Sequence, residues 1–386
     1  MTAPTATRRG QQRQVTQAPF LAGTQEVWEG NDYDQTYNND ASAVNGQPWA
    51  LQATGWLRGL FILVTCTGLT AGTVTADGPA IIFQNIELDD VNNEAIFGPF
   101  DGYTAALTNK YGGYYFADDP FTVSTFAYTG TVTTNNVTFL LYIPLEIVDR
   151  DPVGDVASVN NTASLTLKFT LNAKASIFTA TTGTLSTRVR GTQDFYWQPK
   201  ATDSRGNPVS PEPVANGTTQ YWTQGSFPVA GAGVINQPMP TGLGYDFRNQ
   251  VFLLRDNAGS RANGETNWPD PLIALRYEAN MLLSNINKVV WATLMSREYG
   301  HTNATADSRG GGAGGALVGK ENGVYVNSFA QDFFLHKPGG ETRRTYLPTS
   351  PGSNMIFNGN VGGAGNLYEI VNYVARGGGA AARRAA

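Results

Sequence analysis

Short apolar or alternating runs, each ended by glycine, proline or asparagine, fill the chain between residues 50 and 375. Gly55–Thr70 has an unbroken apolar centre at Leu60–Val64, which is typical of a strand buried on both faces. Ser164–Leu171 instead alternates apolar and polar residues with a period of two, as a half-buried strand does. Further strands are predicted at Pro79–Leu88, Phe121–Thr134, Val137–Val148, Leu185–Trp197, Gln220–Val229, Tyr245–Leu254, Lys288–Arg297, Gly323–Leu335, Asn354–Phe357 and Leu367–Val374.

Two segments favour a helix. The first is a short one near Tyr103–Lys110, inside the otherwise loop-rich Ala95–Tyr115. The second follows Asp270-Pro271, an N-cap and first-turn pair, and has apolar residues at helical spacing from Leu272 to Ile286. A strand would use the same apolar residues, so this second prediction has an alternative.

A proline-rich segment, Pro199–Thr219, divides the chain into two blocks of similar length. Proline lacks the backbone donor that a central strand needs, so the segment reads as a connector. A single core stops growing near ~250–300 residues, which also favours two domains. We expect an N-terminal arm at 1–49 (with little regular structure over Phe20–Trp49), a first β-domain at 50–199, a linker at 200–219, a second β-domain at 220–375 and a flexible tail at 376–386.

The first block contains about seven or eight short predicted strands and no long helix, and the second block is also rich in predicted strands. The fold class is therefore all-β, with a sandwich or barrel as the natural architecture. Charged residues are only 15% of the chain, against about 25% in ordinary domains. Either this is a Gly-, Thr- and Asn-rich β-protein, or much of its surface is buried between subunits.

The net charge of −5 argues against general nucleic-acid binding. The two tails, residues 1–25 and 370–386, are nevertheless basic and contain no acid; their arginines are Arg8, Arg9, Arg13, Arg376, Arg383 and Arg384. They are either solvated ends or contacts for an acidic partner such as anionic lipid headgroups, which attract each nearby arginine by roughly 1 kcal/mol.

Cys66 is the single cysteine and lies in an apolar run, so we expect a buried, inert thiol and no intrachain disulfide. The polar N-terminus lacks the apolar core of a secretory signal, and no apolar run is long enough for a membrane-spanning helix. These features are compatible with folding in a reducing cytoplasm.

Catalytic motifs are weak throughout the chain. Two histidines, His301 and His336, lie 35 residues apart, and with one cysteine they make no zinc site without carboxylates. Gly314–Lys320 matches the start of a phosphate-binding loop, but Glu321 replaces the hydroxyl residue that meets magnesium. Asp149, Asp151 and Asp155 have calcium-loop spacing, but Asn160 stands at the position of the final glutamate. We therefore expect no enzyme activity, metal or cofactor.

The order and spacing of several strand motifs resemble those of double jelly-roll major capsid proteins of the tectivirus kind. Gly55–Cys66 resembles the opening strand of the first roll, and Val137–Asp149 and Ser164–Phe169 resemble later strands. Asn354–Val361 and Leu367–Val374 resemble the closing strands of the second roll. The likeness spans residues 50–375, with poor matches at Gln220–Asp270 and Ala304–Ala316.

This resemblance implies two eight-stranded jelly rolls side by side, with short helices and extended termini. It implies a homotrimer that forms a pseudo-hexagonal capsomer, meets neighbouring capsomers and penton and minor capsid proteins, and tiles an icosahedral virion shell over an internal membrane. The N-terminal arginines would face lipid headgroups, with the C-terminal ones as a second contact, and the protein would not bind nucleic acid directly. Assembly would take place in the host cytoplasm, and Ala95–Tyr115 and Asn257–Trp268 would contribute to outward towers.

Two rival interpretations remain open. One is a glycan-binding β-sandwich of a phage tail or spike, in which exposed tryptophans and tyrosines are ligand platforms. The seven tryptophans mostly flank strands, which suits packing better. The other is a β-sandwich enzyme with an unrecognised carboxylate site.

Overall fold

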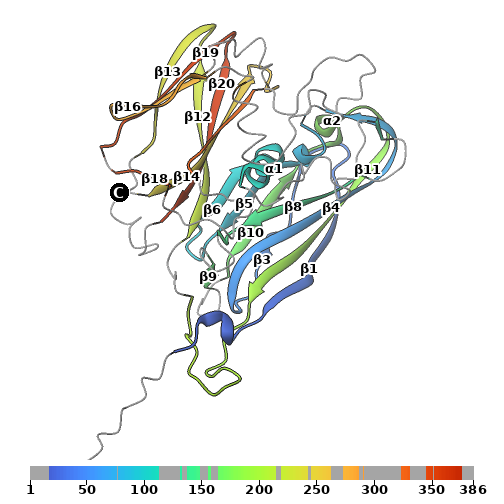
Figure 1. The fold of residues 1–386 in the computed structure, drawn as a ribbon. Coiled ribbons are helices and arrows are strands. Elements are labelled where there is room, and N and C mark those ends of the chain that lie inside the picture. Colours follow the sequence, from blue (N-terminus) through green and yellow to red (C-terminus); the bar gives the residue numbers. More distant parts are fainter. Residues whose placement is uncertain are drawn as a thin grey trace, which may run out of the picture.

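The computed structural model describes residues 17–75, 77–112, 131–132, 137–147, 155–157, 164–213, 219–241, 245–261, 273–286, 290, 323–330, 345–350 and 352–375. Strands dominate this part of the chain, as the period-two and apolar runs predict (Figure 1). In the N-terminal half the elements are η1 (Phe20–Ala22), β1 (Glu26–Asn38), β2 (Val44–Asn45), β3 (Trp49–Ala50), β4 (Trp56–Val74), η2 (Ala80–Ile82), β5 (Phe83–Asp89), β6 (Ala95–Phe100), α1 (Gly102–Tyr111), β7 (Thr131–Val132), β8 (Val137–Pro144), β9 (Val156–Ala157), β10 (Thr166–Leu171), α2 (Lys174–Ile177) and β11 (Phe178–Tyr196).

The C-terminal half contains β12 (Gln220–Val229), β13 (Gly233–Met239), β14 (Asp246–Asp256), β15 (Ile273–Tyr277), β16 (Asn280–Ile286), β17 (Val324–Ser328), β18 (Leu347–Pro348), β19 (Met355–Val361) and β20 (Gly365–Val374). The described strands form three sheets of six, ten and four strands. The six-stranded sheet has the order β1-β11-β4-β7, with β8 and β9 also paired to β4. The ten-stranded sheet has the order β17-β14-β20-β12-β6-β5-β10-β2, with β18 also paired to β14 and β3 to β10. The four-stranded sheet has the order β13-β19-β15-β16.

The architecture is a double jelly roll, in which the ten-stranded sheet is common to both rolls (Figure 1). In the first roll the β5 side of this sheet faces the six-stranded sheet, and Phe83 of β5 packs edge-on against Phe139 of β8. In the second roll the β14 side faces the four-stranded sheet, and Phe252 of β14 lies 4.4 Å from the ring of Phe357 in β19. One continuous cluster of buried apolar residues includes members of both rolls.

The longest pairing joins β4 and β11, and it follows from their sequences. Inward residues of β4 such as Leu60, Ile62 and Val64 are fully buried. Phe61 and Leu63 on the other face are only half-buried, so the prediction of burial on both faces is wrong for that face. Cys66 belongs to the same inward row and is 1% exposed, which confirms the expected buried thiol. Burial raises the pKa of Cys66 to about 12, so the reactive thiolate is suppressed.

The expectation of little regular structure over Phe20–Trp49 is wrong. Glu26–Asn38 forms β1, which pairs antiparallel with β11 along its length and has one irregularity between Gly30 and Tyr33. The many polar residues that hide this strand are those of a sheet edge, where one row of side chains meets solvent. The division at residues 50–199 and 220–375 stays a proposal, and the β1–β11 pairing argues for adding 26–49 to the first roll.

The helix predicted after Asp270-Pro271 is also wrong, and the strand alternative is right. Ile273–Tyr277 and Asn280–Ile286 form the hairpin β15–β16, with Glu278 in the turn at a φ of 54°. Leu275 is fully buried, whereas Met281 and Leu282 are exposed, so the apolar residues serve both faces of a small sheet. Asp270 and Pro271 themselves lie outside the described residues.

Most other predicted elements appear with shifted ends. The short helix near Tyr103–Lys110 is α1, whereas Pro79–Leu88 begins with the turn η2 before β5. Strands β6 and β13 were missed, because glycine and proline in their sequences favour loops. Phe121–Thr134 (apart from Thr131 and Val132), Lys288–Arg297 (apart from Val290) and the end of Gly323–Leu335 lie outside the described residues.

Glu369 is a carboxyl group in the core of the second roll, 1% exposed, and accepts a 2.7 Å hydrogen bond from Gln250. Burial raises the pKa of Glu369 to about 8, although the bond from Gln250 opposes the shift. The folded state therefore holds this proton more tightly than the unfolded chain does. Its contribution to stability is complete below the unfolded pKa and is lost as the pH rises toward 8.

We predict that the free energy of unfolding falls by up to about 1.4 kcal/mol per pH unit between about pH 4.5 and 8 on account of Glu369. Glu369→Gln keeps the shape and has no proton to lose, so its stability advantage over the natural chain should grow across this interval. Urea unfolding at several pH values measures the difference. If the free energy of unfolding changes with pH in the same way in both proteins, the pKa of Glu369 is not raised by folding and the prediction is wrong.

Candidate functional site

The joint between the two rolls is the part of the fold on which any shared function of the rolls depends. Here the ten-stranded sheet is continuous through one parallel bridge, between Phe97 of β6 and Trp222 of β12. Both residues are fully buried. One bridged pair is too little to fix the angle between two rolls, so other contacts must do so.

Helix α1 supplies these contacts. All ten of its residues are buried, as is usual only for a helix enclosed by protein on every side. Gly102 begins the helix so close to η2 that a Cβ there would lie 1.7 Å from the carbonyl oxygen of Ala80. A buried helix leaves four N–H groups and four carbonyl oxygens without partners in its own turns, so its two ends must be satisfied by neighbours.

The C-terminal end of α1 is satisfied by the second roll. Arg248 donates a 2.9 Å hydrogen bond to the carbonyl oxygen of Gly112, and Asn249 donates one of 3.0 Å to that of Tyr111. Arg248 and Asn249 are consecutive residues of β14, and consecutive strand side chains ordinarily point to opposite faces. The β14–β20 register shifts between Phe247 and Asn249, so Arg248 is the extra residue of a bulge, which lets both side chains reach α1. A cation also suits the negative end of the helix dipole.

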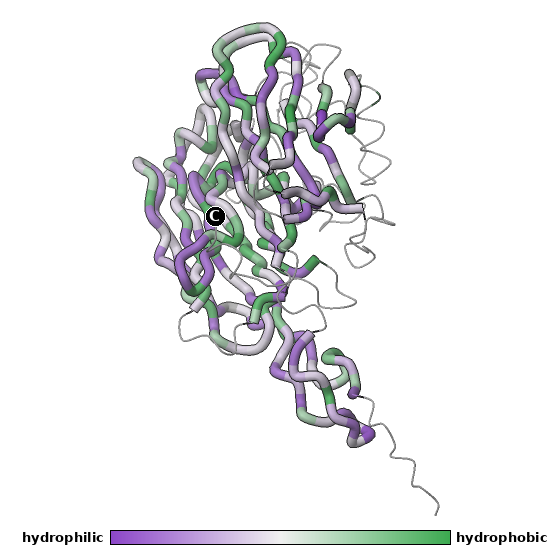
Figure 2. Tube along the Cα trace, turned by 90° about the vertical axis from the view of Figure 1, so that its left-hand side faces the viewer, coloured by the Kyte–Doolittle hydropathy of each residue, from purple (hydrophilic) through white to green (hydrophobic). Residues whose placement is uncertain are grey.

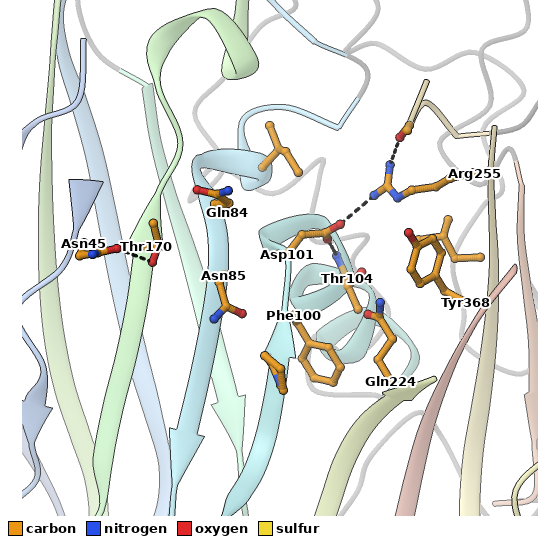
Figure 3. Close-up of a pocket in the computed structure, with 14 residues that line it drawn as sticks. Asn45, Gln84, Asn85, Phe100, Asp101, Thr104, Thr170, Gln224, Arg255 and Tyr368 are labelled. Carbon is orange, nitrogen blue, oxygen red and sulfur yellow. Dashed lines mark hydrogen bonds and ion pairs between the residues drawn. The ribbon is translucent and has the colours of Figure 1, made fainter. Parts of the chain in front are cut away.

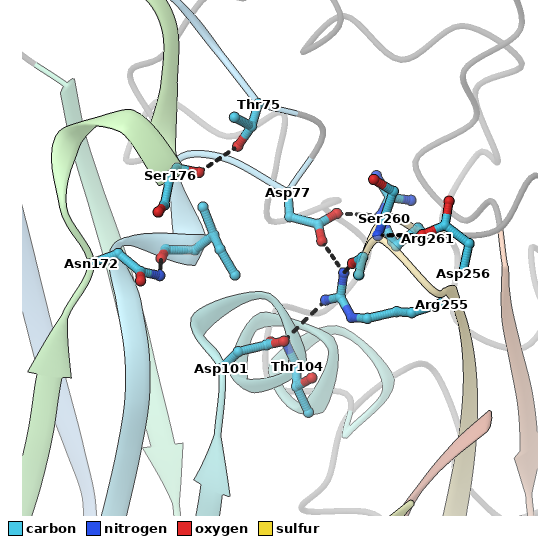
Figure 4. A network of polar contacts seen from close by, with 12 residues as sticks. Thr75, Asp77, Asp101, Thr104, Asn172, Ser176, Arg255, Asp256, Ser260 and Arg261 are labelled. Carbon is cyan, nitrogen blue, oxygen red and sulfur yellow. Dashed lines mark hydrogen bonds and ion pairs between the residues drawn. The ribbon is translucent and has the colours of Figure 1, made fainter. Parts of the chain in front are cut away.

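The N-terminal end of α1 is held by a second arginine of the same strand. Asp101 is the N-cap and accepts a 2.6 Å hydrogen bond from the backbone N–H of Thr104. Arg255 of β14 then donates to the other carboxylate oxygen of Asp101 at 3.0 Å (Figure 4). We call the contacts of Arg248 and Arg255 with the two ends of α1 the arginine clamp.

Asp77 completes the clamp from the first roll. Its carboxylate forms an ion pair with Arg255, with 2.5 Å between the guanidinium nitrogen and the carboxylate oxygen, and a second ion pair with Arg261 (Figure 4). Both guanidinium groups lie over the ring of Tyr103, at 5.8 Å and 4.5 Å from its centroid. Two arginines of the second roll therefore meet two carboxylates and one aromatic ring of the first.

Charges at the clamp remain ionised despite burial. Burial opposes the ionisation of Asp77, but Arg261 and Arg255 outweigh it, so the pKa of Asp77 lies below its ordinary value. Burial likewise opposes the charge of Arg255, but Asp101 and Asp77 outweigh it and raise the pKa of this guanidinium. The cluster is thus a paired set of charges and offers no poised acid or base.

A chain of polar contacts extends from the clamp toward the linker. Arg248 donates to the side-chain oxygen of Asn372 at 3.2 Å, and Asn372 donates to Gln220 at 2.9 Å. Gln220 in turn donates to the carbonyl oxygens of Leu145 and Glu146, each at 3.1 Å. Arg248, Asn372 and Gln220 are all fully buried, so the joint is polar along its length yet closed to water.

Helix α1 also closes an edge of the first roll. The side-chain oxygen of Asn109 accepts a 2.9 Å hydrogen bond from the backbone N–H of Tyr142 in β8, and its amide nitrogen donates to the carbonyl oxygen of Tyr142. The amide group thereby takes the place of a neighbouring strand. An edge covered in this way is unavailable for pairing with another chain.

The linker and the N-terminal segment together form a basal projection, defined as residues 17–25 and 197–210. Ala18 donates to Pro208 at 2.7 Å and accepts from Ser210 at 2.9 Å, so the N-terminal segment runs beside the linker. Phe20 packs edge-on against Trp56 and Tyr196 and attaches the projection to the first roll. Figures 1 and 2 show this unit extending from one end of the body.

Both chain tails begin toward this end. Gln17, the first described residue, lies in the basal projection. At the other terminus the backbone N–H of Ala375 donates to Thr219 at 3.0 Å, beside the start of β12 and the end of the linker. The six tail arginines proposed as membrane contacts (Arg8, Arg9, Arg13, Arg376, Arg383 and Arg384) all lie outside the described residues.

Other predicted site residues have mixed outcomes. His301, His336 and the glycine-rich Gly314–Lys320 lie outside the described residues, as do Asp149 and Asp151. Asp155 is described and buried. Within the described part of the chain, no group of three or more histidine, cysteine or acidic side chains could hold a metal ion. The same part contains no helix that is long and apolar enough to cross a membrane.

The proposed outward tower at Ala95–Tyr115 is wrong over its described part. Residues 95–111 form β6 and the buried helix α1, because the glycines and prolines there permit tight turns inside the joint rather than a surface loop. Of Asn257–Trp268, the described residues 257–261 end at Arg261, which is held against Asp77. Trp49, Trp56 and Trp222 are buried, as packing residues should be, but Trp28 and Trp197 are exposed.

The sequence does not predict the arginine clamp. Arg248 and Arg255 flank the apolar run of β14, where a charge at each end of a strand ordinarily means solvent. The sequence offers one signal, Asp101 as an N-cap residue at the start of a predicted helix. A carboxylate at the end of a buried helix needs a buried cation as its partner.

Comparisons with solved structures define the class of fold. The chain is similar to the major capsid protein of Sulfolobus turreted icosahedral virus, with a TM-score of 0.58 and 12% identity over 91% of this chain and 97% of that one. It is similar to the major capsid protein P2 of bacteriophage PM2, with a TM-score of 0.53 and 8% identity over 91% and 97%. It is also similar to the Faustovirus major capsid protein, with a TM-score of 0.51 and 10% identity over 91% of this chain and 90% of that one.

These similarities extend over nearly the whole chain, so both rolls and their arrangement take part in the match. The double jelly roll is therefore the fold of this chain, as the strand motifs predict. No protein-family model matches the sequence, and a comparison with curated proteins gives no match.

We predict that Arg255→Met lowers the free energy of unfolding by roughly 3–5 kcal/mol, because it leaves Asp77 and Asp101 without their shared cation in a buried site. Chemical denaturation measures this loss. Arg188→Met is a matched control, since Arg188 pairs with Asp34 on the surface and its removal should change stability far less. Equal losses of unfolding free energy in the two variants would show that the clamp stabilises the fold no more than a surface ion pair does.

Proposed function

We propose that this chain is a major capsid protein: a structural subunit that builds a virion shell and is not an enzyme. The observation that carries the proposal is the match of both rolls, over more than nine-tenths of the chain, to major capsid proteins. The paired charges at the clamp also support a structural role, since this buried polar cluster serves the joint.

The subunit contributes two similar wedges, so three copies close a pseudo-hexagonal capsomer. A rigid joint suits this role, because the angle between the rolls sets the six-sided outline. Low surface charge is consistent with large contacts between subunits, which bury roughly 2,000–5,000 Å² when obligate. Capsomers then tile an icosahedral shell together with penton and minor capsid proteins, with assembly in the host cytoplasm.

The two basic tails face an internal membrane in this proposal. Their described starting points, Gln17 and Ala375, both lie toward the end of the subunit that carries the basal projection. The two tails together carry six arginines per chain, and three chains bring eighteen to each capsomer. Repetition across a lattice makes weak single contacts strong.

The glycan-binding spike remains a second candidate, favoured by the exposed rings of Trp28 and Trp197. Exposed aromatic rings are equally suited to contacts between subunits. The whole-chain match to shell proteins favours the capsid role.

We predict a stable homotrimer. Native mass spectrometry of the purified protein at micromolar concentration should give a species of three times the 41.4 kDa chain mass. Electron microscopy should resolve six-sided capsomers. A spectrum that contains only monomer would contradict the proposal.

We also predict that the tails bind anionic membranes additively. Replacing all six tail arginines by glutamine should abolish co-sedimentation with phosphatidylserine-containing liposomes, and replacing three should weaken it partly, at roughly 1 kcal/mol per arginine. Neutral phosphatidylcholine liposomes and the body variant Arg188→Gln are the controls. Undiminished binding of the six-residue variant would refute membrane contact through the tails, and trimer formation would be unaffected.

A further inference from the structure

A groove of about 830 Å³ crosses the joint, and we call it the joint groove (Figure 3). It opens where β6 and β12 separate beyond their single bridge at Phe97 and Trp222. Residues of both rolls line it: Asn85 and Phe100 from the first, and Gln224 and Tyr368 from the second. Its volume lies within the ~300–1,000 Å³ of ordinary small-molecule sites.

The joint groove has no free charge to offer a ligand. Its two charged lining residues, Asp101 and Arg255, bind each other at 3.0 Å as part of the arginine clamp. Every other side chain that lines it is neutral. A charged ligand would lose its hydration there without meeting an opposite charge, which is costly. The lining therefore favours an uncharged ligand.

Amide side chains dominate the open part of the groove. Gln84 and Gln224 are exposed and Asn85 is half-buried, and no hydrogen bond joins their amide groups to another residue of the described chain. An amide group presents a donor and an acceptor side by side. Adjacent hydroxyl groups, each both donor and acceptor, are its natural complement.

Two aromatic residues and a buried hydroxyl complete the lining. Figure 3 shows Phe100 and Tyr368 on either side of Gln224. Phe100 is buried and Tyr368 half-buried, so together they give an apolar wall with a polar tip. The hydroxyl of Thr104, in a side chain 1% exposed, has no hydrogen-bond partner within the described residues. Such a group is rare unless a further molecule satisfies it.

From this combination we propose that the joint groove binds a short neutral saccharide. Sugar hydroxyls match the amide groups, and the apolar faces of sugar rings match Phe100 and Tyr368. The absence of free charge selects neutral over acidic sugars. An uncharged extended peptide has some of the same groups, but it lacks the dense hydroxyls that several amide groups demand, so the saccharide is the better fit.

The position of the groove indicates which saccharides it would meet, and this inference rests on the proposed capsid function. The groove lies beside Asp101 and Arg255, at the N-terminal end of α1. The tails begin at one end of β12 and β20, where Gln220 pairs with Val374, and the groove residues Gln224 and Tyr368 lie near the middle of these strands. With the tails facing inward, the joint groove lies away from the inner surface of the shell, and its ligands are host-surface glycans.

The test is saturation-transfer NMR on the full-length protein. The panel contains maltose, cellobiose, lactose and chitobiose, with sialyllactose as an acidic sugar and a blocked Gln/Thr-rich tetrapeptide as a peptide. We expect transfer to at least one neutral disaccharide and little to sialyllactose. Gln224→Ala should weaken the association constant about five-fold, as expected for one lost hydrogen bond, and Tyr368→Ala at least as much.

Trp28→Ala is the matched control, because Trp28 is an exposed aromatic on β1, outside the groove. It should leave saccharide binding unchanged, and circular dichroism should show all variants folded. The proposal is overturned by no transfer to any neutral sugar, by stronger transfer to the peptide or to sialyllactose, or by binding that survives both groove substitutions. Native mass spectrometry on the same samples reports trimer formation separately, so failure of the groove and failure of the capsid proposal are distinguishable.

Discussion

The structure depends on one constraint: a fully buried helix must have both of its ends satisfied. Helix α1 lies in the joint, and its unpaired backbone groups would each cost free energy if left without partners. At the C-terminal end the second roll meets this need, because Arg248 and the adjacent Asn249 donate to the carbonyl oxygens of Gly112 and Tyr111. At the N-terminal end Asp101 caps the N–H of Thr104, and Arg255 of the second roll pairs with that carboxylate. The helix of one roll is therefore complete only when the other roll is in place.

This arrangement explains why a single backbone bridge is enough at the joint. The bridge between Phe97 and Trp222 aligns the strands of the two rolls within one sheet. The clamp holds β14 against α1 through charge-assisted hydrogen bonds from Arg248 and Arg255, two separated points on the strand. Two anchored points on one strand fix both its distance from the helix and its angle to it. A subunit that must repeat one angle many times in a shell benefits from such a fixed joint.

The sequence predicts the class of fold well and the joint poorly. Runs such as Leu60–Val64 and the alternation of Ser164–Leu171 are local signals, and they became β4 and β10. The hairpin β15–β16 was read as a helix because apolar spacing over a short segment suits both structures, and only the partner strand β19 decides between them. Arg248 acts through a bulge in β14, and Arg255 acts through residues of the other roll, so neither signal is local. The tail arginines are a purely local signal in the sequence, and they lie outside the described residues.

The clamp has a consequence for how the chain is made on the ribosome. Gly112 and Arg248 are 136 residues apart, and Asp101 and Arg255 are 154 residues apart. At about 5–20 residues per second, α1 leaves the ribosome on the order of ten seconds before either arginine exists. During that interval the carbonyl oxygens of Tyr111 and Gly112 lack the donors that Arg248 and Asn249 later supply, so the final closure of the first roll waits for translation to reach β14. The order of synthesis thus makes the second roll the element that finishes the first.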